Sequence, residues 1–370
     1  MRVGVVFGGR SGEHEVSLAS ARSVIEALDP DRFEAVPIGI ARDGRWLLPG
    51  DTEAALRLGP GAPQAGTTGS RAAGAPVAVM PGEERALISP GPGAREGRLG
   101  RLDVIFPVLH GPNGEDGTIQ GLLELAGLPY VGAGVLGSAV GMDKIVQKDL
   151  FVRHGLPVVP YHLLPRRRWR TDPAAAVAEV EAAIGLPCFV KPANLGSSVG
   201  ISRAATAAEL GDALALAARH DARIVSERAV EDARELECGV LGNEAPEASV
   251  VGEVVPHGAF YDYESKYSAG GADLRVPADL PAETRRAVRE LAIRAFEVLD
   301  CAGMARVDFF LERPSGRLFV NELNTIPGFT ATSMYPRLWA ASGLPYRQLV
   351  TRLIDLALER HADRHGPGAG

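Results

Sequence analysis

Two carboxylates, one amide and one guanidinium, on two β-rich runs near the C-terminal end, have the types and spacing to build a site in which the oxygen atoms bind a metal ion. Arg306 and Asp308 lie two positions apart on the first run, and Glu322 and Asn324 lie two positions apart on the second. A Pro-Ser-Gly turn signal separates the runs, so we predict a β-hairpin with Asp308 opposite Glu322. Because side chains alternate along a strand, all four would share one face of this hairpin.

The oxygen atoms of Asp308, Glu322 and Asn324 suit Mg²⁺, which binds few protein carboxylates and completes its shell with water and phosphate oxygens. The alternative is a solvated strand face that holds an ion pair. The metal-binding interpretation is favoured because the opposite face already carries apolar residues to bury, namely Phe309, Leu311, Phe319 and Leu323. Gly328 follows the hairpin closely, and a glycine there lets the backbone approach a ligand and offer its N–H to an oxyanion.

A loop rich in glycine and serine follows a predicted strand that ends at Lys191. The loop includes Ser197 and Ser198, and its hydroxyls and backbone N–H groups suit the binding of phosphate. It is not a Walker A loop, because the glycine spacing differs and the lysine precedes the loop. Alone, such a loop is more often only a connection, but beside a metal-binding hairpin the phosphate-binding interpretation is favoured.

Two other segments carry residues that have two interpretations. Lys144 lies on a helix predicted to start near Met142, where a lone lysine is more often a solvated surface residue. Residues 260–267 are polar and rich in tyrosine, and they include Lys266 and Tyr267. This segment is either a lid that covers a site or a surface loop stabilised by its tyrosines.

The connection between the first predicted strand and the first predicted helix, residues 8–15, contains Glu13. Its glycine spacing differs from the GxGxxG fingerprint of dinucleotide-binding proteins, which disfavours an oxidoreductase. Glu13 stands at a helix start, where a carboxylate either binds a ligand or interacts with the helix dipole. His110 follows a predicted strand at 102–108, at the carboxyl edge of the sheet where α/β proteins bind ligands.

Three segments must position these residues. Residues 2–7, 15–28 and 33–40 have the pattern of a strand, a helix and a strand, which predicts a βαβ unit and a parallel sheet. Residues from about 50 to 100 are rich in Gly, Ala and Pro, and we predict a long, partly disordered insertion there. A second α/β segment and a third, strand-rich segment follow. We expect three domains, at residues 1–132, 133–227 and 228–370.

The composition excludes several classes of protein. The net charge of -7 over 370 residues argues against a nucleic-acid-binding protein. Three widely spaced cysteines, with no CxxC pair, indicate buried apolar residues in a reducing compartment. No run approaches the ~18 apolar residues that a membrane helix requires. We therefore expect a cytoplasmic protein with no membrane segment.

Together these motifs resemble the D-alanine–D-alanine ligase family of bacterial cell-wall synthesis. Seven blocks occur in the family's order: GGRSGEHEVSL, HGPNGEDGTIQG, GMDK, KPANLGSSVG, FYDYESKY, ARVDFF and NELNTIPGFTATS. No single block is decisive, but seven in order are highly specific. The resemblance covers the chain from Gly8 to about Glu359, except most of the 50–100 insertion. It implies a three-domain ATP-grasp fold of mixed α/β and α+β class, with an N-terminal parallel α/β domain.

The resemblance also implies roles for individual residues. Those implied in binding two ions of Mg²⁺ or Mn²⁺ are Asp308, Glu322 and Asn324. Those implied in ATP binding are Lys144, Lys191, Ser197, Ser198, Glu227, Arg228, Val230, Glu235 and Lys266. Those implied in catalysis are Glu13, Ser197, Tyr267, Arg306 and Gly328. Those implied in D-alanine binding are Glu13, His110 and Ser333.

The reaction implied by the resemblance is the ATP-dependent joining of two D-alanines through an acyl phosphate, for peptidoglycan synthesis. Relatives that make D-alanyl-D-lactate typically have a histidine in place of the lid tyrosine. Tyr267 therefore favours D-alanine as the second substrate. Arg228 departs from the lysine of many relatives, which weakens the assignment of that contact. The family also implies a homodimer.

Two other hypotheses remain at this point. The first is another ATP-grasp carboxylate–amine ligase, such as a biotin carboxylase-like or purine-pathway enzyme, which would share the hairpin but lack FYDYESKY. The second is a nucleotide-binding regulatory protein with an inactive site. That protein would have lost at least one of Lys191, Asp308, Glu322 or Asn324, and all four are present.

Overall fold

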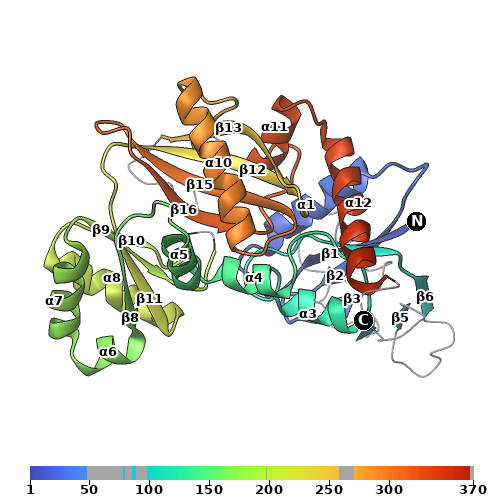
Figure 1. The fold of residues 1–370 in the computed structure, drawn as a ribbon. Coiled ribbons are helices and arrows are strands. Elements are labelled where there is room, and N and C mark those ends of the chain that lie inside the picture. Colours follow the sequence, from blue (N-terminus) through green and yellow to red (C-terminus); the bar gives the residue numbers. More distant parts are fainter. Residues whose placement is uncertain (48–77, 80–85, 89–97, 197, 258–270, 367–370) are drawn as a thin grey trace.

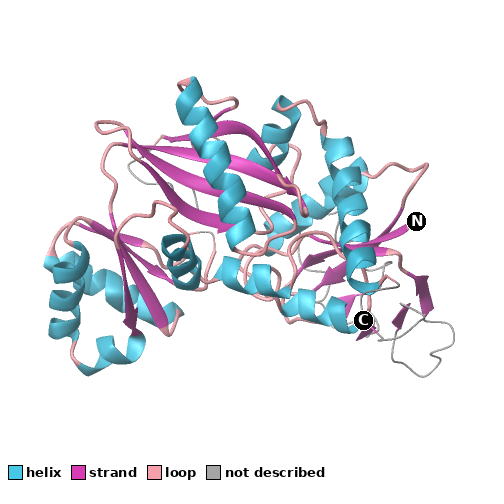
Figure 2. Cartoon of the chain, in the orientation of Figure 1, coloured by secondary structure: helices cyan, strands magenta, loops and turns pink. Residues whose placement is uncertain are grey.

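The computed structural model describes residues 1–47, 78–79, 86–88, 98–196, 198–257 and 271–366. Three larger sheets follow one another along the chain, and helices cover their faces (Figures 1 and 2). Among the described helices, none is both long enough and apolar enough to cross a membrane.

The first sheet has the strand order β3-β2-β1-β7 and contains the predicted βαβ unit. Strands β2 and β7 both pair in parallel with β1, which confirms the predicted parallel sheet, and β3 adds an antiparallel edge. Its elements are β1 (Arg2–Gly8), α1 (His14–Ala27), β2 (Glu34–Ile40), β3 (Trp46–Leu47), β7 (Val104–Pro107) and α3 (Thr118–Leu125).

Most of the predicted insertion at 50–100 lies outside the described residues. Its described parts are three short strands, which the sequence did not predict: β4 (Ala78–Val79), β5 (Ala86–Ile88) and β6 (Arg98–Arg101). They form a small antiparallel sheet of their own, in the order β4-β5-β6.

The second sheet is antiparallel, in the order β10-β9-β11-β8, with helices against it. Its strands are β8 (Tyr161–Pro165), β9 (Cys188–Pro192), β10 (Ser202–Ala204) and β11 (Arg223–Arg228). Its helices are α6 (Arg166–Thr171), α7 (Pro173–Ile184) and α8 (Ala207–His220). Strand β9 is the one predicted to end at Lys191, and it ends one residue later, at Pro192.

Helices α4 (Val135–Met142) and α5 (Lys144–Arg153) precede the second sheet. The helix predicted to start near Met142 is α5, and α4 is a separate helix that was not predicted. Asp143 separates the two, because its extended backbone ends α4 and its carboxylate accepts hydrogen bonds from the N–H groups of Ile145 and Val146. This cap fixes where α5 begins and therefore where Lys144 points.

The third sheet is antiparallel, in the order β14-β13-β12-β15-β16, with α10 across one face (Figure 1). Its strands are β12 (Ala233–Gly242), β13 (Glu247–Pro256), β14 (Ala272–Arg275), β15 (Gly303–Glu312) and β16 (Leu318–Asn324). The helices of this part are α10 (Ala282–Val298), α11 (Met334–Ala341) and α12 (Tyr346–His365).

The predicted hairpin is β15–β16, and its register confirms that Asp308 lies opposite Glu322. A register shift between Asp308 and Phe309 leaves Asn321 as an additional residue on β16. Beyond this shift, the side chains of β16 that face the core are the ones that would otherwise face away from it. Val320 therefore takes the buried position and is 0% exposed. The prediction that Phe319 lies on the buried face is therefore wrong. Its ring is partly exposed, below the guanidinium of Arg317.

One apolar core joins parts of the chain that are far apart in sequence. It contains residues of β1, α1 and β7 together with Leu349, Leu353 and Ile354 of α12. Figure 1 shows α12 beside α1, away from the second sheet. The final helix therefore packs on the N-terminal sheet rather than only on the third sheet that precedes it.

All three cysteines are free and buried, which agrees with the prediction from their spacing. Burial raises the pKa of the Cys188 thiol to about 11 and that of the Cys238 thiol to about 12. Thiols with such pKa values are hardly ionised near neutral pH, so these residues are structural rather than reactive.

Candidate active site

A cavity of about 1080 Å³ opens between the three sheets, and fifteen of the predicted site residues line it. Those fifteen are Glu13, His110, Lys144, Lys191, Ser198, Glu227, Arg228, Val230, Glu235, Arg306, Asp308, Glu322, Asn324, Gly328 and Ser333. The other three, Ser197, Lys266 and Tyr267, lie outside the described residues. Residues predicted from four separate motifs therefore meet around one space.

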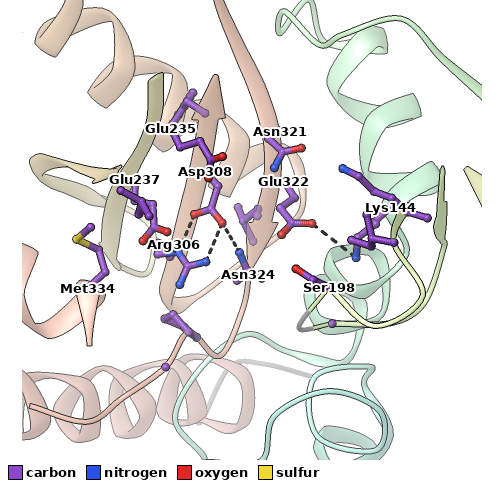
Figure 3. Close-up of a pocket in the computed structure, with 18 of the residues that line it drawn as sticks. Lys144, Ser198, Glu235, Glu237, Arg306, Asp308, Asn321, Glu322, Asn324 and Met334 are labelled. Carbon is purple, nitrogen blue, oxygen red and sulfur yellow. Dashed lines mark hydrogen bonds and ion pairs between the residues drawn. The ribbon is translucent and has the colours of Figure 1, made fainter. Parts of the chain in front are cut away.

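A row of acidic side chains crosses three strands at one wall of the cavity. Glu237 of β12 lies opposite Asp308 of β15, which lies opposite Glu322 of β16. Arg306 Nε and Nη2 donate to the two carboxylate oxygens of Asp308, at 2.6 and 2.7 Å, and Nε is 3.0 Å from Glu237 Oε2. Asn324 Nδ2 donates to Asp308 Oδ2 at 3.0 Å (Figure 3).

Arg306 keeps its charge although it is buried. Burial alone would lower the pKa of its guanidinium, but the carboxylates of Asp308 and Glu237 outweigh burial and raise that pKa well above its usual value. Glu237 was not among the predicted site residues. The alternation of Glu235 and Glu237 along one strand was the signal that could have identified it.

Two lysines, Lys144 and Lys191, line the cavity, and a third, Lys148, is buried beside them. Lys191 Nζ donates to Glu227 Oε2 at 2.8 Å, and Lys148 Nζ lies 3.3 Å from Glu227 Oε1. Lys144 Nζ donates to the carbonyl of Leu195 at 2.7 Å and lies 3.6 Å from Glu322 Oε2. The lysine cluster thus lies directly beside the acidic hairpin, and Lys144 is within 3.6 Å of one of its carboxylates.

Lys148 was missed by the sequence analysis. It is 1% exposed and lies one helical turn after Lys144 on α5, and its Nζ also donates to the backbone carbonyl of Asn321 at 2.9 Å. Burial would raise the pKa of Glu227, but Lys148 and Lys191 outweigh burial and lower it. The i,i+4 spacing of Lys144 and Lys148 was the available signal.

The loop after β9 approaches the side of the cavity that the N-terminal part of the chain forms. Ser198 and Gly200 have positive φ values of 59° and 74°, which turns this loop sharply. A Cβ atom added at Gly196 would lie 3.2 Å from Glu13 Oε2, so the loop and Glu13 are neighbours. Arg228 Nε donates to the carbonyl of Ile184 at 3.2 Å, which holds that side chain against the end of α7.

Glu13 occupies the N-cap position of α1, but its side chain makes no capping hydrogen bond. Its carboxylate also neighbours Gly111, where an added Cβ would lie 3.0 Å from Glu13 Oε2. This placement at the cavity edge supports the ligand-binding interpretation over a purely local role in the helix. Ser333 lies near Gly328, since a Cβ at Gly328 would be 3.3 Å from Ser333 Oγ.

Glu115, also missed from sequence, lines the cavity beside Glu13. Its Oε2 accepts a hydrogen bond from Gly111 N at 2.6 Å, and its Oε1 accepts one from Ile326 N at 3.3 Å. Burial and the neighbouring Glu13 raise the pKa of Glu115 to about 8 and outweigh these hydrogen bonds.

The residues of the acidic hairpin fit a divalent cation. Among the described residues, no group of three or more His, Cys, Asp or Glu side chains has the arrangement of a metal site. The predicted set differs from such a group, because Asn324 supplies an amide oxygen beside the carboxylates of Asp308 and Glu322. Two carboxylates and an amide from facing strands suit Mg²⁺, which takes its other ligands from water and phosphate.

An N-terminal α/β sheet joined to two antiparallel sheets, with Lys191 on one and an acidic hairpin on the other, defines an ATP-grasp protein. The family comparisons are more specific. Residues 2–133 match the family described as D-ala D-ala ligase N-terminus, and residues 150–355 match D-ala D-ala ligase C-terminus. The chain belongs to the D-alanine–D-alanine ligase family.

Similar proteins cover almost the whole chain. The D-alanine–D-alanine ligase of Ruminiclostridium cellulolyticum is 48% identical over 98% of this chain and 96% of its own length. That of Deinococcus radiodurans is 50% identical over 97% and 98%.

Two solved structures resemble the whole fold. The D-alanine-D-alanine ligase of Coxiella burnetii has a TM-score of 0.83 at 37% identity, over 98% of this chain and 95% of that one. The VanG D-Ala:D-Ser ligase of Enterococcus faecalis has a TM-score of 0.82 at 36% identity, over 96% and 99%.

The hairpin assignment predicts that Glu322→Gln weakens Mg²⁺ binding by at least about 10-fold. The amide keeps the size of the side chain but removes a charged oxygen donor. Titration of Mg²⁺ into the protein with ADP, followed by calorimetry, measures the change. Glu312→Gln is the matched control, because Glu312 lies on the same hairpin and pairs with Arg317 at its exposed end. Equal Mg²⁺ affinity in wild type and Glu322→Gln would refute the assignment.

The raised pKa of Glu115 predicts a pH dependence of stability. Between about pH 4.5 and about pH 8 the folded protein keeps a proton on Glu115 that the unfolded chain has lost, so the wild-type unfolding free energy falls as pH rises. Glu115→Gln cannot titrate. Relative to wild type, it should therefore gain stability steadily from pH 5 to pH 8 in urea unfolding. A difference in unfolding free energy that stays constant with pH would contradict the raised pKa.

Proposed function

We propose that this protein joins two D-alanines to D-alanyl-D-alanine with hydrolysis of ATP to ADP and phosphate, for peptidoglycan synthesis. The observation that carries the proposal is that the acidic hairpin, the lysines and Glu13 line one cavity. The identity of 48–50% to D-alanine–D-alanine ligases over nearly the whole chain supports the same reaction.

Nucleotide binding is the role of the second and third sheets. Lys144 and Lys191 are within reach of phosphates placed before the hairpin, and Arg228 and Val230 line the same cavity, where their backbone groups would lie near the adenine. Glu227 would contact the adenine, and Glu235 the ribose. Asp308, Glu322 and Asn324 would hold Mg²⁺ or Mn²⁺, as two ions. The metal would neutralise charge on the phosphates and orient them for transfer.

In the first step, the carboxylate of one D-alanine attacks the γ-phosphorus of ATP. The bond between this phosphorus and the β–γ bridging oxygen breaks, giving an acyl phosphate and ADP. Glu13, which lines the cavity, would hold the ammonium group of this D-alanine. Lys144 and Lys191 stabilise the charge on the transferring phosphoryl group. Ser197, Ser198, Lys266 and Tyr267 would enclose the phosphates and the first D-alanine.

In the second step, the amine of the other D-alanine attacks the acyl carbon, and the bond from that carbon to the phosphate oxygen breaks. The proton lost by the attacking amine leaves with phosphate or solvent. Negative charge develops on the acyl oxygen, and Arg306 and the N–H of Gly328 would stabilise it. Ser333, near Gly328, would bind the carboxylate of the second D-alanine.

D-Serine is a second candidate for the second substrate. The observation in its favour is the structural similarity to the VanG D-Ala:D-Ser ligase. D-Alanine remains the proposal, because the relatives at 48–50% identity are D-alanine–D-alanine ligases and because Tyr267 is present.

The test is ADP release from purified protein with ATP and Mg²⁺ near neutral pH. We compare D-alanine alone, L-alanine alone, and D-alanine with either D-serine or D-lactate, and identify the products by mass spectrometry. Turnover with D-alanine alone, yielding the dipeptide, is expected. A mixed product that predominates at equal concentrations would overturn D-alanine as the second substrate. If there were no turnover with any of these substrates while nucleotide still bound, the protein would instead be another ATP-grasp ligase with a different substrate.

We also infer the three domains 1–132, 133–227 and 228–370, since the first and third sheets each fall within one of them and the second sheet extends past its boundary by Arg228 alone. A cytoplasmic location, where ATP is supplied, agrees with three free buried thiols and would be checked by cell fractionation.

We also propose that the protein forms a homodimer. Four large apolar side chains are exposed on the contacting helices α3 and α4, namely Leu122 (38%), Leu125 (78%), Val135 (41%) and Leu136 (59%). Such a group of exposed side chains is typical of an interface.

The dimer proposal predicts that the variant Leu125→Glu with Leu136→Glu sediments as a monomer, because it places charges in the apolar contact. Wild type should sediment as a dimer at the same concentration in analytical ultracentrifugation. Val152→Glu, a change at an exposed valine on α5, is the matched control and should remain dimeric. If the double variant remained a dimer, the interface would not be formed by α3 and α4.

A further inference from the structure

A chain of hydrogen bonds connects the N-terminal sheet to the loop that follows the metal-binding hairpin. His110 Nδ1 lies 3.1 Å from the carbonyl oxygen of Ile326, and His110 Nε2 lies 3.2 Å from Ser20 Oγ. Ser20 Oγ also accepts a hydrogen bond from Phe329 N at 3.4 Å. Glu115 Oε1 accepts from Ile326 N at 3.3 Å. Both polar groups of the Ile326 residue are therefore bound by the N-terminal part of the chain.

The chemistry of these groups allows one consistent arrangement of protons. A carbonyl oxygen only accepts, so His110 Nδ1 must carry the proton and donate to Ile326. In the neutral imidazole, Nε2 then accepts from the hydroxyl of Ser20, which itself accepts from Phe329 N. Burial lowers the pKa of His110 and outweighs the nearby Glu13, which favours this neutral form.

The loop held in this way contains Gly328. Ile326 and Phe329 stand on either side of the Pro327-Gly328 pair, and both are anchored. The ring of Phe329 packs against Phe106 and Tyr346, with centroids 5.6 and 5.7 Å apart, and Tyr346 Oη donates to its carbonyl at 2.7 Å. Gly328 therefore lies between two anchored residues. The positions of these two residues determine where the Gly328 N–H points.

We propose that Ser20, His110 and Glu115 are positioning residues that hold the Gly328 N–H in place for the second step of the reaction. This inference rests on the proposed function. His110, predicted from sequence to contact substrate, has both ring nitrogens engaged by the protein, so it acts through the loop instead.

The proposal separates the two steps of the reaction. Attack on the γ-phosphorus develops no charge on the acyl oxygen, whereas attack of the amine on the acyl carbon does. A displaced Gly328 N–H should therefore slow ligation and leave acyl phosphate formation much less affected. Loss of one oxyanion donor typically costs about 100- to 1000-fold in rate, and a shifted donor costs less.

The first experiment uses Ser20→Ala and measures two rates with ATP labelled with ¹⁸O at the β–γ bridge. Dipeptide formation should fall roughly 10- to 100-fold, while scrambling of the label into the β-phosphate, which reports reversible acyl phosphate formation, should fall much less. Ser23→Ala is the matched control, because Ser23 lies one turn further along α1 and its hydroxyl, within the described part of the chain, bonds its own helix at the Ala19 carbonyl. A purely structural defect would lower both rates equally and overturn the proposal.

The second experiment compares His110→Asn with His110→Gln. The Asn amide nitrogen can replace Nδ1 as donor to Ile326, whereas the longer Gln reaches towards Ser20 and leaves the Ile326 carbonyl unbound. His110→Asn should retain at least about threefold more ligation activity, with equal ADP affinity in both variants as the measure of folding. Higher activity in His110→Gln would contradict the proposal. If the wild-type protein formed no dipeptide, the proposed function would be refuted. The positioning role is refuted only by the variants, in a wild type that does form dipeptide, so the two results are distinguishable.

Discussion

The burial of Glu227 between two lysines is the interaction on which the rest of the site depends. Lys191 comes from the strand next to Glu227, and Lys148 comes from a helix that precedes the whole second sheet. A carboxylate in such a place costs several kcal/mol to desolvate, and only well-placed cations offset that cost. Because Lys148 also binds the carbonyl of Asn321, the same cluster fixes the distance between the second sheet and the acidic hairpin.

The hairpin supplies the complementary half of this arrangement. Glu237, Asp308 and Glu322 stand in one row and would repel one another without cations between them. Arg306 lies against two of these carboxylates, and Lys144 lies near the third. The lysines and the acidic row therefore lie side by side in one cavity, and a polyphosphate with its metal ion would match both.

The sequence predicted what depends on local pattern and missed what depends on distant contacts. The hairpin register followed from alternation and a turn signal, but the extra residue Asn321 could not be foreseen, because a bulge leaves no compositional trace. Strand β11 was missed because its residues Glu227 and Arg228 look like a polar loop, although Lys148 and Lys191 pair with Glu227 inside the fold. Glu115 was missed for a similar reason, since its partner Ile326 is 211 positions away.

The position of α12 has a consequence for how the chain folds during synthesis. The core under β1 is completed by Leu349, Leu353 and Ile354, which are translated more than 300 residues later. The core of the second sheet does not need later residues, because the cluster that forms it runs from residue 164 to residue 224. On the ribosome, the second sheet can therefore finish folding while the first still exposes apolar surface. The order of folding therefore differs from the order of the chain, because the first sheet needs a helix that is synthesised after the second sheet.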